Sequence, residues 1–499
     1  MGETMNWLDK IISVFDPVRA CERAYFRESL RQYDAAATDR LNGDWAPVYG
    51  TAEQVAGVSR DIIRGRARAA ELNSDLAESA IKALLRNVIG TGIKPQAKIR
   101  SKNGKLNTQL NKKIEDAWDK WIEAEHSDVR AISTFYELQE MALRRLLYDG
   151  EILINKTAVG NYLPLSIQLI EAENIGAVSM NNGNNDIING VEVNENGRPL
   201  AYHVYKSDPL GMRSFQATRL PVSQAFLLYQ PKRPSQLRGI SELSLVLKRI
   251  HDIDEFMDAD LIAARVAACF SAFVTGENSG RQLVNLKKDY KGRKLKGLAP
   301  GVIHHLTAGE SVSFAEPRRN ASNAAEYSAT QSRRVSAGLG MSSEIVTRQI
   351  TGNFSAARQN LLEDQKTFKP IQLFMIKHFC MPIWKSFIEA CFLKGILNVQ
   401  DYVTNKERYT AVSWLTPGWS WIDPVKEVSA NKESVKAGMT TLEDICSAQG
   451  KDWEEVLEQR KVEQDRAREL GVILDLDGDL STLIDDDQKE GDIDGKNRE

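Results

Sequence analysis

The chain has 499 residues and a formal net charge of −3, with 42% apolar and 27% charged residues. Such a composition is typical of a folded protein of two to four domain-sized units. It excludes a disulfide framework, because the five cysteines are odd in number and form no CxxC pair, and a membrane helix, because no run approaches 18 apolar residues. The near-neutral charge neither indicates nor excludes nucleic-acid binding, since local patches matter more than the sum. We also expect no signal peptide, because the first residues lack an apolar region followed by a cleavage site.

The first 230 residues are predicted to form helices followed by short strands. After an amphipathic segment over 1–45, apolar residues at helical spacing predict helices over 52–90 and 112–125. The period changes at Asp149 and Gly150, a hairpin-type pair, where a β region begins. Asn-Gly pairs punctuate that region, and we therefore predict an α+β unit.

Residues 229–250, YQPKRPSQLRGISELSLVLKRI, form a basic, proline-containing collar before a long helix. Ser241 is predicted to cap that helix, because a serine side chain accepts from the free N–H groups of a first turn. No Gly or Pro occurs from Glu242 to Thr275, which predicts a rod of about 30 residues, or about 45 Å. Four collar residues are candidates for DNA contact or, preferably, for a mechanical hinge: Lys232, Arg233, Arg238 and Gly239.

Residues 271–318 are predicted to form short strands around a basic run. Residues 281–296 carry seven basic residues against one acidic, which suits DNA phosphates or an acidic partner protein. An ordinary solvated loop is an equal alternative. The basic candidates are Arg281, Lys287, Lys288, Lys291, Arg293, Lys294 and Lys296.

Small residues over 321–340 predict a second helix, followed by a polar loop that could be mobile and functional, or an ordinary connector. A long helix is predicted over 355–394, broken or kinked at Pro370 and Pro382. Helices then follow to about 470, and the tail from 473 carries ten acidic residues against three basic. The loop candidates are Thr347, Arg348, Gln349, Ile350, Thr351, Gly352 and Asn353.

Motifs of common enzymes are absent from the sequence. It contains no GxxxxGK[ST], GxSxG or HExxH, and its six histidines do not stand at metal-ligand spacing with cysteines. Asp254 and Asp258 lie one helical turn apart and could bind a divalent ion, although a solvated or subunit-facing helix surface explains them as well. The stretch DLDGDL at 475–480 fails as a calcium loop, because Leu480 stands where glycine is needed. We predict no catalytic residue, metal or cofactor.

Ordered along the chain, several segments resemble one known family. They are LLRNVIGTGIKPQ (84–96), LYDGEILI (147–154), IQLIEAENI (167–175), GVEVNENGRPLAYHVY (190–205), the collar itself, DADLIAARVAACF (258–270), SAGLGMSSEIVT (336–347), FSAARQNLLED (354–364), PGWSWIDPVKE (417–427) and AGMTTLEDI (437–445). In this combination the sequence is similar to the portal proteins of lambda-like tailed bacteriophages. No single motif is decisive, but their order over roughly 20–470 is specific.

The resemblance implies an α+β portal fold, assembled as a ring of typically twelve copies around a DNA channel. It divides the chain into an N-terminal segment (1–24), a wing (25–240 and 357–425, with the kinked helix), two stem helices (241–270 and 319–341), a clip (271–318), a tunnel loop (342–356), a crown (426–475) and an acidic tail (476–499) expected to be disordered.

The same resemblance implies function and partners. The ring would sit at a capsid vertex, after assembly in the host cytoplasm, and would nucleate the procapsid, pass DNA in and out, and bind double-stranded DNA without sequence preference. It implies docking of the terminase large subunit, a head-completion or adaptor protein, the major capsid protein and a scaffold, and no membrane. Two alternatives stay open at this point: a metal-dependent DNA-processing enzyme using Asp254 and Asp258, and a capsid or scaffold component.

Overall fold

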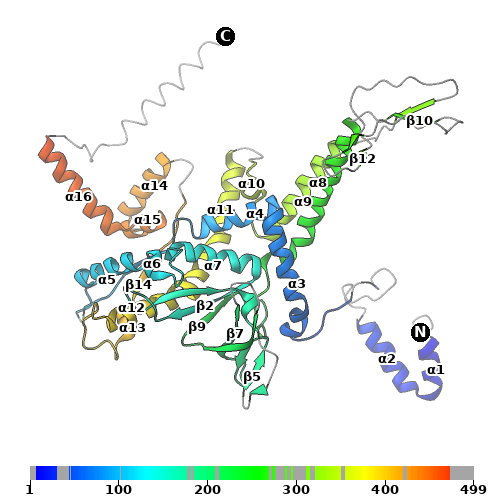
Figure 1. The fold of residues 1–499 in the computed structure, drawn as a ribbon, viewed down its shortest axis with the longest axis horizontal. Coiled ribbons are helices and arrows are strands. Elements are labelled where there is room, and N and C mark those ends of the chain that lie inside the picture. The colour runs from blue at the N-terminus through cyan, green and yellow to red at the C-terminus, as the bar shows by residue number, and fades with distance from the viewer. Residues whose placement is uncertain are drawn as a thin grey trace, which may run out of the picture. The chain divides into compact units, whose positions relative to one another are not determined.

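The computed structural model describes residues 7–30, 44, 46–101, 103–176, 181–182, 185–207, 213–268, 272–275, 287–288, 294–295, 311–314, 321–349, 354–419 and 424–471. The chain divides into two compact units, one formed by Met1–Ser59 with Arg233–Gln236 and the other by Arg60–Lys232 with Leu237–Glu499. Helices and strands alternate through the second unit, so the fold is mixed α+β, as predicted (Figure 1).

The first unit contains two short helices and the beginning of a third. Helices α1 (Trp7–Phe15) and α2 (Pro17–Leu30) meet at Asp16, whose carboxylate accepts a hydrogen bond from the N–H of Arg19 at 3.2 Å. Helix α3 (Ala52–Asn73) starts in this unit, and its first N–H donates to the hydroxyl of Ser235 at 3.1 Å.

An aromatic core holds the helical part of the second unit together. Trp118 and Trp121 from α5 pack against Phe135 from α7 and against Trp384 and Phe387 from α12, with ring centroids 4.9–5.6 Å apart. Such rings remove large apolar areas from water and prefer these tilted and edge-to-face contacts. The helices of this part are α4 (Asp75–Val88), α5 (Thr108–Trp121), α6 (Ala124–Ser127), α7 (Phe135–Asp149) and α12 (Met381–Leu393).

Two antiparallel sheets follow the change of period at Gly150. Helix α7 packs on the central strand of a three-stranded sheet of order β3-β2-β9, and a five-stranded sheet runs in order from β4 to β8 (Figure 1). The strands are β2 (Glu151–Thr157), β3 (Ser166–Ile170), β4 (Asn181–Asn182), β5 (Asn185–Ile188), β6 (Val191–Val193), β7 (Pro199–Ser207), β8 (Arg213–Pro221) and β9 (Ala225–Tyr229), with the 3₁₀ turn η2 (Ala172–Asn174) between β3 and β4.

The predicted rod of about 30 residues is shorter than expected. A 3₁₀ turn η3 (Glu242–Leu245) comes first, then α8 (Leu247–Ala268), and Ala272–Thr275 forms strand β10, in agreement with the short strands predicted from residue 271. Absence of Gly and Pro did not reveal the later start of α8, because a tight 3₁₀ turn needs neither residue. The 22 residues of α8 rise about 33 Å. Ser241 does cap the first turn, accepting a hydrogen bond from the N–H of Leu243 at 3.2 Å.

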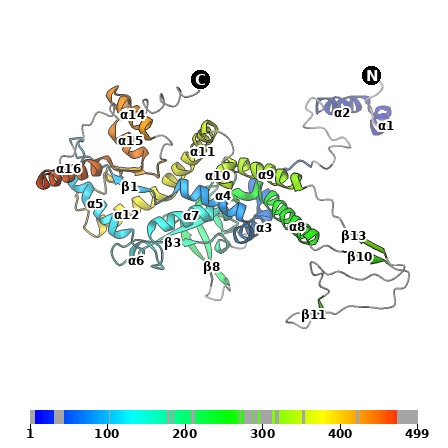
Figure 2. The same cartoon turned by 90° about the horizontal axis from the view of Figure 1, so that it is seen from above.

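Helix α9 (Ala321–Gly338) runs beside α8 in both views (Figures 1 and 2). The ring of Phe256 on α8 lies 4.8 Å from that of Tyr327 on α9. Three further short strands belong to the segment between these helices: β13 (Ser311–Phe314), which pairs with β10, and the paired β11 (Lys287–Lys288) and β12 (Lys294–Leu295).

The long helix predicted over 355–394 is continuous at Pro370, where the sequence predicted a break or a kink. Helix α11 (Phe354–Met375) contains Pro370 without ending there. One π-helical turn, η4 (Ile376–Cys380), then joins α11 to α12, where Pro382 is the second residue. The π turn precedes Pro382, which has no backbone N–H and so cannot donate the hydrogen bond that a regular α-helix would require at this position. Of the two outcomes predicted at Pro370, the break was therefore wrong, and the kink stays a prediction.

The C-terminal elements are β14 (Val412–Leu415), paired with β1 (Lys94–Ala97), and four helices: α13 (Lys406–Tyr409), α14 (Pro424–Lys436), α15 (Leu442–Ala448) and α16 (Trp453–Leu470). Thr441 and Asp444 form a capping box that starts α15, and the Asp452 carboxylate caps α16. Among the helices that the structure describes, none combines the length and the apolar character that crossing a membrane requires.

Candidate joint and tunnel-loop sites

A buried ion cluster lies where the collar passes the turn between α7 and β2. The Glu151 side chain, first in β2, is 0% exposed. Arg238 Nε donates to Glu151 Oε2 at 2.8 Å, and Arg64 Nη2, from α3, donates to Oε1 at 3.0 Å. The backbone N–H of Gly239 adds a bond of 2.8 Å to Oε2. One carboxylate thus joins three distant segments, and we call Arg64, Gly150, Glu151, Arg238 and Gly239 the joint.

Arg238 serves the interior of the joint. Besides Glu151, its guanidinium donates to the backbone carbonyls of Ala172 at 3.1 Å and Asn189 at 2.5 Å. The residue is 3% exposed, so of the two interpretations of Arg238 only the mechanical one is compatible with the folded chain. Burial lowers the pKa of Arg64, and the neighbouring positive charge of Arg238 lowers it further, while Glu151 opposes the shift.

Two glycines allow the main chains of the joint to touch. Gly150 ends α7 in the left-handed region with φ of 87°. A Cβ on Gly239 would lie 2.0 Å from the carbonyl oxygen of Gly150, and a Cβ on Gly150 would lie 2.2 Å from the backbone of Ile240. Glycine is therefore needed at Gly239 because the two main chains approach closely.

The other basic collar residues lie at the surface. Lys232 pairs with Glu242 at 2.9 Å, and both side chains are partly exposed. Arg233, in the first unit, donates to the carbonyl of Gly50 at 2.8 Å. Contact of Lys232 or Arg233 with DNA therefore stays a prediction.

The base of the predicted tunnel loop is ordered rather than irregular. Residues Ser343–Thr347 form the short helix α10. Ser342, just before it, donates its N–H and its hydroxyl to the buried carboxylate of Asp364 on α11, at 2.7 and 2.5 Å. Ser79 on α4 donates to the carbonyl of Val346 at 2.6 Å. The prediction of a loop beginning at 342 was therefore wrong for its first residues, because these contacts stabilise a helical turn.

Three of the seven loop candidates lie in the described part of the chain. Thr347 closes α10 and donates its hydroxyl to the carbonyl of Ser343 at 2.7 Å. Arg348 follows in the left-handed region with φ of 57°, and both it and Gln349 are exposed. The remaining four lie outside the described residues: Ile350, Thr351, Gly352 and Asn353.

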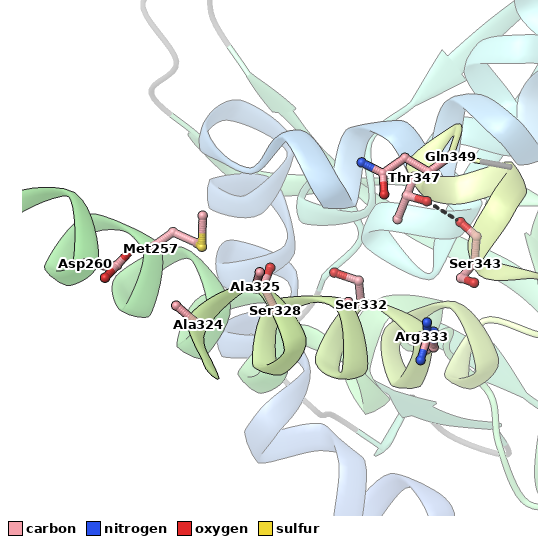
Figure 3. Close-up of a pocket in the computed structure, with 11 residues that line it drawn as sticks. Met257, Asp260, Ala324, Ala325, Ser328, Ser332, Arg333, Ser343, Thr347 and Gln349 are labelled. Atoms are coloured by element: carbon pink, nitrogen blue, oxygen red, sulfur yellow. Dashed lines mark hydrogen bonds between the residues drawn. The ribbon is translucent and has the colours of Figure 1, made fainter. Parts of the chain in front are cut away.

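A groove of about 530 Å³ connects this loop base to the two long helices. Figure 3 shows Thr347 and Gln349 on one side of it and small side chains of α9, such as Ala325 and Ser332, on the other. Met257 and Asp260 from α8 line one end. The structure thus brings loop and helix-pair residues together at one surface.

Other sequence candidates have separate places. Lys287 and Lys288 belong to β11 and Lys294 to β12, facing each other in register as Lys288 and Lys294, while the other clip candidates lie outside the described residues: Arg281, Lys291, Arg293 and Lys296.

The Asp254 carboxylate is held by a hydrogen bond from Ser74, and its pKa is raised, chiefly by burial. The described residues contain no group of three or more His, Cys, Asp or Glu side chains that could hold a metal ion.

Sequence reasoning missed Glu151 and Arg64 as members of the joint. They stand 87 residues apart, and although Glu151 belongs to the segment LYDGEILI, nothing in that segment points to Arg64. The one local signal was an ionisable residue, Glu151, at the start of an otherwise apolar strand, which predicts a charged partner when the strand is buried.

Comparison with known proteins agrees with the order of segments in the sequence. Residues 38–372 match the family model described as "Phage portal protein, lambda family". The chain therefore belongs to the lambda family of phage portal proteins, and as such it is a structural component of the virion and not an enzyme.

Individual relatives are similar to this chain over most of its length. The "Probable portal protein" of Halomonas phage phiHAP-1 is 26% identical over 462 residues, covering 89% of this chain and 88% of the relative. Portal protein B of Escherichia phage lambda is 20% identical over 459 residues, covering 84% and 86%. Among solved structures, the neck of a native gene transfer agent particle computed with C12 symmetry has a TM-score of 0.42 and 11% identity, covering 81% and 93%.

Proposed function

We propose that this portal protein assembles into a ring of typically twelve copies at a capsid vertex, nucleates the procapsid and passes DNA through its centre. The observation that carries the ring is the exposed apolar surface of α8, where Met257, Leu261 and Ile262 are 47%, 47% and 59% exposed. Large apolar side chains gathered on one surface helix indicate a protein interface.

The groove beside α9 supports the same proposal. Its Ala and Ser side chains are short, and short side chains let another helix approach closely. An apolar helix on one copy and a small-residue helix on the next would bury each other around a ring. Because every copy carries both surfaces, the contact is head-to-tail, and such a contact forms a ring when the rotation between neighbours closes.

The ring is tested with the double variant Leu261→Asp and Ile262→Asp. We expect native mass spectrometry and negative-stain images to show closed rings for the natural protein and unassembled chains for the variant. The matched control is Asp258→Asn on the same helix, which should keep the rings. Monomers from the natural protein under all conditions, or intact rings from the double variant, would count against the proposal.

Within the ring, we place the tunnel loop at the DNA channel, with Arg348 and Gln349 as its described contact residues. Their exposure, and the anchoring of the loop base through Asp364, support this role. A subunit of net charge −3 does not hold DNA tightly by counterion release, which suits a conduit through which DNA slides. Arg348→Glu should leave rings intact and reduce the length of DNA packaged. Arg334→Glu on α9 should leave both the rings and the packaged length unchanged.

The clip is proposed to dock the terminase large subunit during filling and a head-completion protein afterwards. Its basic residues are the supporting feature, since lysine and arginine suit acidic partner surfaces. Changing Lys287, Lys288, Arg293 and Lys294 together to Ser should preserve rings and lower packaging. Unchanged packaging would rule out the docking role. Contacts of the wing with the major capsid protein and a scaffold complete the proposal.

A further inference from the structure

A second pocket, of about 570 Å³, lies away from the joint and the stem. It is bordered by the end of β2, the turn before β9, the π turn with α12, and α13. Its outstanding feature is four lysines, which we call the lysine pocket: Lys156, Lys377, Lys385 and Lys406. Glu389 and Glu407 are the acidic residues in its lining.

The π turn aligns the lysines that the helix contributes. Lys377, Met381 and Lys385 follow each other at intervals of four residues, and all three line the pocket. In a regular α-helix that interval drifts around the axis by about 40° each time. The wider turn over Ile376–Cys380 rotates the chain in the opposite sense and so keeps these residues on one side. Isolated π turns are often found at functional sites.

The positive charges of the pocket are only partly neutralised. Lys406 pairs with Glu389 at 3.1 Å and lies 5.7 Å from the centre of the Tyr402 ring. Lys156 is half-buried and donates to the hydroxyl of Ser386 at 3.1 Å, and burial lowers its pKa despite the nearby Glu389. Within the described part of the chain, Lys377 and Lys385 form no ion pair. The pocket is therefore suited to bind an anionic group.

The lining favours carboxylates over a nucleic-acid backbone. All four cations are lysines, which act as point charges, and none is an arginine, whose fork matches phosphate. Val222, Met381 and Pro382 provide apolar surface between the charges. An acidic peptide with interspersed apolar side chains fits this mixture.

The chain carries such a peptide after its last described helix. Residues 475–487 read DLDGDLSTLIDDD, with six aspartates around three leucines and an isoleucine. Helix α16 ends at Leu470, and the 14 residues from 472 to 485 can extend at most about 46 Å. We propose that the lysine pocket binds the acidic segment 475–487 of this chain and so fastens the C-terminal tail to the wing. The inference does not depend on ring formation.

The experiment is zero-length crosslinking of the full chain with a carbodiimide, which joins carboxylates only to amines in direct contact. We expect isopeptide links from Asp485, Asp486 or Asp487 to the lysine pocket. Lys377→Glu with Lys385→Glu should lower their yield about tenfold. The matched control, Lys366→Glu with Lys369→Glu on α11, should leave it unchanged.

A charge exchange separates pairing from a folding defect. Adding Asp485→Lys, Asp486→Lys and Asp487→Lys to the pocket double variant interchanges carboxylates and amines, so the links should return. Links spread evenly over surface lysines, an equal yield from pocket and control variants, or no recovery after the exchange would overturn the proposal. So would a pocket that DNA fragments protect from the reagent while the tail does not reach it.

Discussion

The joint and helix α8 of this portal protein differ in how far their side chains are exposed. At the joint, Arg238 and Glu151 are 3% and 0% exposed, and their polar atoms find partners within the same chain. Along α8, the large side chains of Leu261 and Ile262 stay 47% and 59% exposed. The joint is complete in one subunit, whereas α8 exposes apolar side chains among the described residues, as a protein interface does.

This difference indicates where rigidity and assembly reside. A buried ion cluster that joins α3, β2 and the collar fixes the direction in which the collar leads into η3 and α8, because displacing one partner would leave a buried charge unpaired. Exposed apolar side chains contribute little to the isolated fold and can contribute to association. Substitutions at the two regions should therefore affect different measurements.

The largest effect is expected from Arg238→Ala. This change leaves the Glu151 carboxylate buried with Arg64 as its remaining side-chain partner, and removing one member of a buried pair costs about 3–5 kcal/mol. Urea unfolding measures the loss of unfolding free energy. The control Lys232→Ala removes a partly exposed pair and should cost at most about 1 kcal/mol. Equal losses from both variants would contradict a special role for the joint.

Gly239→Ala should have the next largest effect. Its Cβ would stand 2.0 Å from the backbone oxygen of Gly150, so the main chains must separate, at a cost of about 1–3 kcal/mol. Gly65→Ala in α3 is the matched control, because that glycine has open space and lies inside a helix. We expect the control to be stabilising by about 0.5–1 kcal/mol, so that thermal midpoints shift in opposite directions.

Acidification should change the contributions of two carboxylates to folding stability in opposite directions. Burial works to raise the pKa of Glu71, but hydrogen bonds from Arg145 and Arg144 outweigh it and lower that pKa. Its stabilising contribution is therefore present above the unfolded value of 4.5 and is lost as pH falls through the folded pKa. We expect the stability gap between the natural protein and Glu71→Gln, roughly 1 kcal/mol at pH 7, to close in acid.

Asp254 at the base of α8 supplies the contrast. Burial raises its pKa, so its contribution is most favourable below the unfolded value of 3.8 and is lost as pH rises through the folded pKa. Asp254→Asn should consequently be neutral or slightly stabilising at pH 7, with an effect that fades in acid. Unfolding titrations of both variants between pH 3 and 8 compare the signs, and parallel curves would contradict this account.

The smallest effect is expected at Met257. Replacing this 47% exposed side chain with Ser should change the stability of the unassembled chain by less than about 0.5 kcal/mol. Ile253→Ala, one turn earlier on the same helix at 5% exposure, should cost about 2–5 kcal/mol. Calorimetry on unassembled protein makes the comparison. A similar loss at both positions would show that Met257 is buried within its own subunit.

Local patterns in the sequence were sufficient for much of the architecture. The cap at Ser241, the change from helices to strands at Gly150 and the small-residue helix before Gly338 each depend on neighbouring residues, so the sequence alone predicted them. The resemblance to lambda-like portal proteins likewise needed no coordinates, and the match over residues 38–372 confirmed the family.

Element boundaries and loop structure were less predictable. The helix of the rod began later than predicted, because η3 has the tighter geometry of a 3₁₀ turn, which no Gly or Pro signals. Pro370 did not break its helix, and the base of the tunnel loop became helical through Asp364 and Ser79. In each case a tertiary contact or a flanking turn outweighed the local preference.

What the sequence by itself determined is the family, the order of elements and the chemical character of each surface. The tertiary structure decided which charges are buried and which lie at the surface. Arg238 and Lys232 are both basic collar residues, yet one lies beneath the backbone of the joint and the other at the surface. That choice depends on Arg64 and Glu151, which only folding brings to Arg238, because ion pairing acts through space and not along the chain.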